Sequence, residues 1–145
     1  MHKVKDFISQ FTDKEIINIV KIGRSYFLAG EEQKRLSEKI NQEMFSIGIF
    51  LGESKKEFKP SPALIDIIAG LSDKKVFITK KAEWLFLCRR DVFEKNIVKK
   101  NVEKGLVLVQ NDKDENLGYG RIVTKGKKIF IKNLLDKGYY LRREN

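Results

Sequence analysis

The side chains most often used in catalysis are scarce in this chain. It contains one histidine, His2, and one cysteine, Cys88. A zinc site needs several Cys or His ligands, and a Ser-His-Asp triad needs a histidine beside the serine, so this content favours neither. No glycine–lysine phosphate loop is present, and Gly118-Tyr119-Gly120 lacks the spacing of a dinucleotide-binding fingerprint. We therefore expect a protein without catalytic activity, cofactor or metal.

The remaining candidates for chemistry are acidic side chains and the single thiol. The acids lie at predicted helix starts and in the turn Asp112-Lys113-Asp114-Glu115, where solvation accounts for them. Asp66 interrupts an apolar segment, and we interpret it as a solvated or capped acid. Cys88 ends the apolar run Leu85-Phe86-Leu87-Cys88, which predicts a buried, unreactive thiol.

The positive charge of the chain lies entirely in its second half. The net charge is +10. Residues 1–73 contain 11 lysines and arginines and 11 acids, whereas residues 74–145 contain 19 basic and nine acidic residues. Such an asymmetry indicates a polyanionic partner for the second half, although a surface selected only for solubility is the alternative. Lipid phosphate is disfavoured because no amphipathic helix with a basic face stands out.

Length and hydropathy place limits on the class of protein. The chain has 145 residues, enough for one domain or two small ones, and 41% of them are apolar, which is enough to fold. No stretch approaches the roughly 20 apolar residues of a membrane span, and no secretory signal is recognisable. We therefore expect an intracellular, cytoplasmic protein that does not contact membranes.

The first half shows mixed helix and strand patterns. An amphipathic helix is predicted for residues 2–11, a helix for residues 31–42, and a strand for residues 45–51 that ends near Gly52. Residues 16–28 are ambiguous: Thr12 and Glu15 have the spacing of a helix capping box, but the β-branched run that follows favours a hairpin turning at Gly23-Arg24, which we choose. A further helix is predicted between Ser61 and Gly70. Ser61 can cap its N-terminus, Pro62 suits its first position, and Gly70 can adopt the left-handed conformation that ends a helix.

The second half is mostly strand. Residues 76–78 predict a strand and residues 80–88 a short helix, followed by a continuous apolar strand, 106–109, that should be buried on both faces. Further strands are predicted for residues 117–123, 128–132 and 139–142, which together suggest a small barrel or sandwich. We expect an α+β protein with a boundary between residues 1–72, an α/β half-domain with antiparallel strands, and residues 73–145.

Residues 117–124 contain a misleading motif. Leu117-Gly118-Tyr119-Gly120-Arg121-Ile122-Val123-Thr124 is similar to the aromatic octamer of RRM domains, but its first, fifth and last positions carry the wrong residue types. We instead predict a structural role, in which Gly118 and Gly120 share one strand face and allow another element to approach closely.

The order of these patterns resembles a PUA domain, the module named for pseudouridine synthases and archaeosine transglycosylases. The opening of a PUA domain resembles the predicted strand followed by Ala82-Glu83 and Phe86-Leu87. Its middle resembles the strand that begins at Gly105, and its closing strand resembles Gly138-Tyr139-Tyr140-Leu141-Arg142. Where PUA domains usually have a glycine in the loop after their helix, this chain has Arg89-Arg90. The loop at residues 125–128 is also short. The resemblance implies a PUA-type β-barrel in residues 73–145.

The first half narrows the resemblance to the Nip-seven family of ribosome-biogenesis factors, in an archaeal-type member. Four features carry this likeness: Tyr26-Phe27-Leu28 before a helix, the glycine-broken strand ending at Gly52, Phe58, and the run from Leu64 to Gly70. It implies a non-catalytic factor that binds rRNA or pre-rRNA, in single-stranded or loop regions, for the large ribosomal subunit. It also implies that the N-terminal domain contacts ribosome-assembly proteins, with a nucleolar location if the source is eukaryotic.

The expected RNA contacts come from two arguments. The resemblance places RNA against the PUA helix and the last strand, which implies Lys80, Lys81, Arg89, Arg90, Arg142 and Arg143. Strand alternation places Lys128 and Lys132 on the face opposite Ile129 and Ile131, as an outward basic pair. A protein–protein adaptor, a translation factor of the mature ribosome and a modification enzyme remain as rival functions, the last disfavoured because no catalytic domain is left over.

Overall fold

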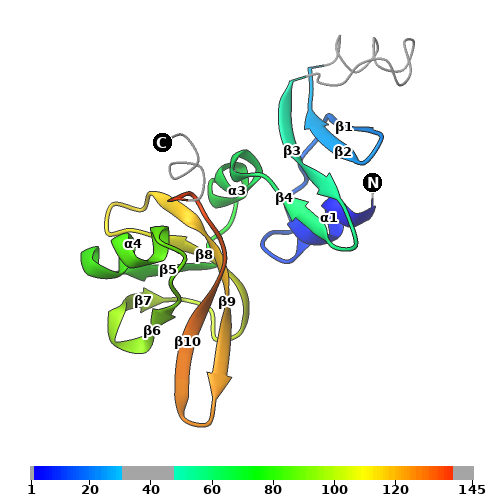
Figure 1. Cartoon of the computed structure of the whole chain (residues 1–145). Helices are drawn as coiled ribbons and strands as arrows, with labels where there is room; N and C mark the ends of the chain where they lie inside the picture. The colour runs from blue at the N-terminus through cyan, green and yellow to red at the C-terminus, as the bar shows by residue number, and fades with distance from the viewer. Residues whose placement is uncertain (1, 31–47, 139–145) are drawn as a thin grey trace. The chain divides into compact units, whose positions relative to one another are not determined.

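The computed structural model describes residues 2–30 and 48–138, which divide into two compact units, residues 1–71 and residues 72–145 (Figure 1). Both units combine helices with a sheet, so the expected α+β class is confirmed. The predicted helix 31–42, the start of the strand predicted from residue 45, and the closing strand 139–142 lie outside the described residues.

The first unit packs one amphipathic helix against a four-stranded antiparallel sheet. Helix α1, His2–Ser9, buries Val4, Phe7 and Ile8, and Phe11 just beyond it is also buried, which confirms the predicted helix. The sheet has the order β1-β2-β3-β4, with strands β1 (Ile19–Ile22), β2 (Ser25–Leu28), β3 (Ile49–Ser54) and β4 (Phe58–Pro60).

The ambiguous segment of the first unit is a hairpin, as predicted. Strands β1 and β2 pair antiparallel around Gly23, whose φ of 62° suits a tight turn. The competing capping-box helix does not form: no helix follows Thr12 directly, although the Thr12 hydroxyl accepts a hydrogen bond from the Lys14 N–H at 3.1 Å. The following strand, β3, continues two residues past the predicted end near Gly52, because Glu53 and Ser54 also pair with β4.

Helix α3, Pro62–Ala69, begins as its sequence predicts and ends differently. The Ser61 hydroxyl accepts a hydrogen bond from the Leu64 N–H at 3.1 Å, and Pro62 occupies the first helical position. The predicted left-handed exit at Gly70 is wrong: its φ is −77° and its ψ −13°. The Gly70 N–H still bonds to the carbonyl oxygens of Asp66 and Ile67, so the backbone extends the helical turn by one residue.

The second unit is built on one curled six-stranded sheet (Figure 1). The order is β6-β10-β9-β8-β5-β7, antiparallel except for the parallel pair β5 and β8. The strands are β5 (Lys75–Ile78), β6 (Val92–Phe93), β7 (Ile97–Lys100), β8 (Gly105–Gln110), β9 (Asn116–Lys125) and β10 (Lys128–Asp136). Helix α4, Lys80–Leu87, follows β5, and the 3-10 helix η2, Glu94–Asn96, follows β6.

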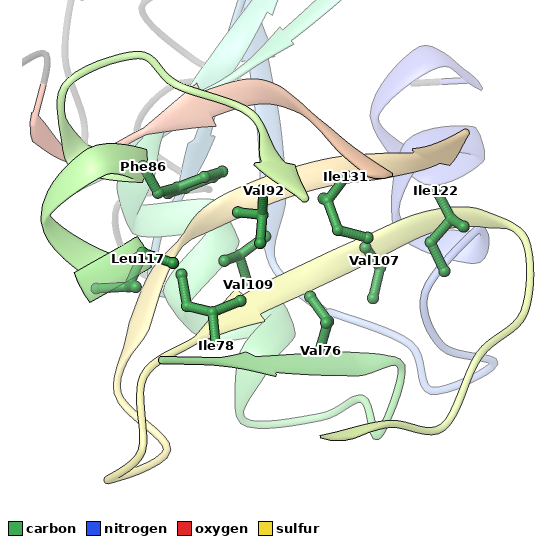
Figure 2. Packing of buried hydrophobic residues seen from close by; sticks show 10 residues of the cluster. Val76, Ile78, Phe86, Val92, Val107, Val109, Leu117, Ile122 and Ile131 are labelled. Carbon is green, nitrogen blue, oxygen red and sulfur yellow. The ribbon is translucent and has the colours of Figure 1, made fainter. Parts of the chain in front are cut away.

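The core of the second unit lies inside the curl of this sheet (Figure 2). Every residue of β8 from Leu106 to Gln110 is buried, which confirms the strand predicted to be covered on both faces. Phe86 of α4 packs into the same cluster with no exposed surface. The cluster combines Val107 and Val109 of β8 with side chains of the other strands, among them Val76, Ile78, Val92, Ile122 and Ile131.

The strand glycines of β9 allow a close backbone approach, as predicted. A Cβ atom on Gly118 would lie 1.9 Å from the Leu135 carbonyl oxygen, and one on Gly120 would lie 2.4 Å from the Lys132 carbonyl oxygen. Both carbonyl groups belong to β10, so the pair of glycines lets β10 coil tightly against β9.

The prediction that Cys88 is buried is wrong, because its side chain is exposed. Helix α4 ends at Leu87 with Phe86 facing the core. At about 100° per residue, a position two residues after Phe86 points away from the core, so the run of four apolar residues does not share one face.

Candidate nucleic-acid interface

The first basic surface of the second unit combines the exposed side of α4 with the loop that follows it. The N-terminus of α4 is fixed by the Thr79 hydroxyl, which accepts a hydrogen bond from the Ala82 N–H at 3.2 Å. Lys80 and Lys81 lie four and three residues before Trp84, so all three project from the same side of the helix. We call the set Lys80, Lys81, Trp84, Arg89 and Arg90 the helix–loop surface.

Trp84 was not among the residues predicted from the sequence, although it is 68% exposed. An exposed indole between lysines offers an apolar face and a hydrogen-bond donor next to positive charge. The opposite side of the helix carries the buried Ala82 and Phe86, which is why Trp84 faces outward. A tryptophan at helical spacing from two lysines was the available signal in the sequence.

The loop after α4 has the backbone conformation for which glycine is usually selected. Arg89 has a φ of 71°, which is uncommon for a residue with a side chain. The Arg89 N–H donates to the Phe86 carbonyl oxygen at 3.1 Å, and the Arg90 N–H donates to the Leu85 carbonyl oxygen at 3.0 Å. The turn is therefore formed with an arginine at the left-handed position, and both arginines are exposed.

Asn133 of β10 ties this loop to the sheet. Its side-chain amide donates to the carbonyl oxygen of Phe86 at 2.9 Å and to that of Arg90 at 3.3 Å. Its backbone N–H donates to Asp91 Oδ1 at 2.9 Å. The register of β10 against β9 shifts just after Asn133. Such a β-bulge changes the direction in which the neighbouring side chains point. Sequence reasoning did not identify this residue.

The second basic surface lies on the outer face of β9 and β10. Lys132 pairs with Arg121 and Lys128 pairs with Lys125, and paired residues of antiparallel strands project to the same side. All four are exposed, whereas Ile131 and its partner Ile122 are buried on the other face, so the predicted outward orientation of Lys128 and Lys132 is confirmed. We call Arg121, Lys125, Lys128 and Lys132 the sheet-face surface.

The structure places six of the eight predicted contact residues. Lys132 and Asn133 are consecutive in β10, and Asn133 bonds to the Arg90 carbonyl oxygen, so this strand connects the two surfaces while their side chains project to opposite faces. Lys128 lies four residues before Lys132, or about 13 Å away along the strand. Arg142 and Arg143 lie outside the described residues.

Comparison with known proteins bears on the same part of the chain. Residues 74–145 match the family described as UPF0113 PUA domain. The second half is a PUA domain. Domains of this class generally bind RNA, and in this chain residues 74–145 also hold the whole positive excess.

Archaeal proteins provide the related sequences. A UPF0113 protein of Archaeoglobus fulgidus is 30% identical over 107 residues, which cover 67% of this chain and 62% of that protein. A UPF0113 protein of Aeropyrum pernix is 33% identical over 103 residues, covering 68% of this chain and 58% of that protein. These alignments thus span about three fifths of the length of the curated relatives.

One solved structure shares the fold along most of the chain. It is described as the structure of a conserved PUA domain protein from Thermoplasma acidophilum. The TM-score is 0.55 at 15% identity, with 94% of this chain and 89% of that chain covered. At this identity the likeness concerns the fold alone, and it agrees with the PUA-type sheet expected for the second half.

The acidic turn between β8 and β9 forms hydrogen bonds within the PUA domain. Gln110 and Lys75 donate hydrogen bonds to the Asp114 carboxylate, at 2.9 Å and 3.1 Å, and lower its pKa below the usual 3.8. Asn111 donates from its side-chain amide to Glu83 and Glu115 at 3.3 Å and 3.0 Å. These carboxylates thus hold the turn between β8 and β9 in place.

Within residues 2–30 and 48–138, no group of three or more His, Cys, Asp or Glu side chains is arranged to hold a metal ion. No helix in the same ranges is both long and apolar enough to cross a membrane.

Proposed function

We propose that this protein is a non-catalytic RNA-binding factor whose PUA domain binds rRNA or pre-rRNA during assembly of the large ribosomal subunit. The observation that carries the proposal is the charge split, with a net charge of zero in residues 1–73 and +10 in residues 74–145. The half with the positive charge is the half that matches a PUA domain.

The two basic surfaces favour an RNA ligand over the alternative that their charge serves only solubility. On the outer face of β9 and β10, the paired positions Arg121 with Lys132 and Lys125 with Lys128 place like charges directly opposite each other. Like charges at paired positions destabilise a sheet. A polyanion across this face would relieve the repulsion, and arginine can bind phosphate through two hydrogen bonds.

The absence of catalysis is part of the proposal. Asp66 is exposed on α3, and the acids of the turn around Asp114 bond to Gln110, Lys75 and Asn111. The hydrogen bonds of the turn carboxylates give them a structural role, which accounts for them without catalysis. Replacing Asp66 with Asn should leave the cellular role intact, and loss of that role in a stably folded variant would contradict the proposal.

The ribosomal role rests on the resemblance to the Nip-seven family, in which a first domain contacts assembly proteins and the PUA domain contacts RNA. With this role we propose a cytoplasmic location, or a nucleolar one if the source is eukaryotic. The test is sedimentation of cell extracts with detection of the protein. Association with precursors of the large subunit is expected, whereas association only with mature ribosomes would favour a translation factor.

RNA binding itself is tested with the full chain. A labelled short oligouridine is titrated by fluorescence anisotropy at several salt concentrations. If about three to five phosphates of single-stranded RNA are neutralised, log K should fall with log salt with a slope of about −2 to −3.5. Weak retention at low salt with no such slope would instead favour a protein–protein adaptor.

A further inference from the structure

We propose that Phe93 and Phe130 form a stacking platform on which unpaired bases of single-stranded RNA lie, beside the basic side chains of the sheet-face surface. The inference rests on the proposed function and makes it more specific, because it assigns the ligand to RNA with exposed base faces. Neither phenylalanine was among the contact residues predicted from the sequence.

The sheet register places the two rings side by side on the outer face. Phe93 of β6 pairs with Phe130 of β10, and the adjacent pair, Val92 with Ile131, is buried in the core. Because side chains alternate along a strand, both rings point away from that core. Their centroids are 6.4 Å apart and their planes are inclined by 43°.

The platform is exposed. Phe93 is 59% exposed, although it belongs to a domain with a well-packed core. Phe130 is partly buried and has Val123 of β9 as its other strand partner. Together these three side chains form an apolar strip across β6, β10 and β9.

Basic residues lie on two sides of this strip. Along β10, Lys128 and Lys132 lie two residues before and after Phe130, or about 7 Å to each side. Across the sheet, Lys125 and Arg121 lie on either side of Val123. A hollow of about 680 Å³ lies beside the rings, and its charged lining consists of Glu94, Lys95, Lys125 and Lys128.

An aromatic strip flanked by lysines and an arginine matches the two parts of a single-stranded nucleic acid. Its phosphates require positive charge, and its bases present π faces that stack on aromatic side chains. A duplex would satisfy the lysines but keeps its base faces stacked inside the helix. Two phenylalanines have no hydrogen-bonding group, so the platform is expected to tolerate different bases.

The test compares a ligand with bases and one without. Full-length protein is titrated with a labelled short oligouridine and with inorganic polyphosphate, using the double variant Phe93→Ile/Phe130→Ile. Isoleucine keeps the apolar surface and suits a strand but cannot stack. Loss of stacking should weaken oligouridine binding at least about fivefold and leave polyphosphate binding unchanged. Phe93→Tyr should bind as the wild type does.

The controls separate the possible failures. Val98→Ala alters another exposed apolar residue, 67% exposed on β7, and should change neither affinity. The single variant Phe93→Ile, at the more exposed ring, guards against misfolding of the double variant, and melting temperatures are compared for all proteins. Unchanged oligouridine binding, or an equal loss for both ligands, would overturn the platform while leaving RNA binding in place. A wild-type protein that binds neither ligand would instead overturn the proposed function.

Discussion

The side-chain amide of Asn133 donates a 2.9 Å hydrogen bond to the carbonyl oxygen of Phe86, at the last turn of α4. Phe86 is fully buried, so this contact joins the core of the PUA domain to the exposed loop that carries Arg89 and Arg90. The same amide reaches the Arg90 carbonyl oxygen at 3.3 Å. Asn133 is thus a positioning residue for one basic surface and the neighbour of Lys132 in the other.

Replacing Asn133 with Ala should both destabilise the PUA domain and weaken RNA binding. Loss of its two hydrogen bonds to loop carbonyl groups should lower the free energy of unfolding by about 1–3 kcal/mol. Urea denaturation followed by far-UV circular dichroism measures this change. Leu134→Ala, at the next position in the bulge, is the matched control and should cost less, because Leu134 is 39% exposed. Equal stabilities of N133A and the wild type would contradict the role assigned to Asn133.

Replacing Gly118 with Ala should destabilise the sheet strongly. Its φ is 143°, and the added Cβ would lie 1.9 Å from the Leu135 carbonyl oxygen. Backbone strain and the clash together should cost about 2–4 kcal/mol. Gly126→Ala, with a φ of 65° and no atom within 4 Å of the new Cβ, serves as the control and should cost about 1–2 kcal/mol. Thermal melts that rank the two variants in the opposite order would argue against the close approach of β10.

Neutralising the helix–loop surface should weaken RNA binding without changing stability. The triple change Lys80→Gln/Lys81→Gln/Arg90→Gln keeps the helix propensity of α4 and removes three exposed charges. If two of these contact phosphates, affinity should fall roughly 10- to 100-fold, and the salt slope should become shallower by about 1.4. Lys113→Gln, in the acidic turn, should bind normally. Identical affinities of the triple variant and K113Q would place the RNA elsewhere.

Trp84 provides an internal reporter of the same surface, because it is the single tryptophan of the chain and is 68% exposed. RNA lying along α4 should quench its fluorescence in parallel with the binding measured by anisotropy. Trp84→Ala should weaken binding by about 1–3 kcal/mol if a base stacks on the indole, with little change in melting temperature. Constant tryptophan emission at saturating RNA would show that the ligand avoids the helix.

The Asp114 carboxylate should contribute stability that depends on pH. Gln110 and Lys75 hold its pKa below 3.8 in the folded protein, so its contribution is fully present above that value and is lost as the pH falls through the folded-state pKa. Because the side chain is 55% exposed, Asp114→Asn should cost less than about 1 kcal/mol at pH 7.

The difference between D114N and the wild type should therefore shrink below about pH 3.8 and disappear in stronger acid. Asparagine also tolerates the φ of 60° at this position, so the backbone does not complicate the comparison. Asp112→Asn tests a neighbouring acid of the same turn. A D114N deficit that grows as the pH falls would contradict the assigned direction of the pKa shift.

Local patterns predicted most of the described elements. The α1 helix, the β1–β2 hairpin and the buried strand β8 follow from periodicity and turn chemistry, which act over a few neighbouring residues. The Ser61 cap of α3 is equally local. The error at Gly70 concerns the backbone, which stays in the right-handed region at the end of α3. The error at Cys88 arose because successive helical residues are rotated by about 100°, so one apolar run does not lie on a single face.

The sequence by itself determined the α+β class, the concentration of charge in residues 74–145 and the outward orientation of Lys128 and Lys132, because composition and strand alternation are properties of the chain alone. Only the tertiary structure decided which distant residues meet. The pairing of Phe93 with Phe130, and the bonds from Asn133 to the loop carbonyl groups of Phe86 and Arg90, join segments about 40 residues apart. Such contacts depend on strand order and on the register shift after Asn133, which no local spacing encodes.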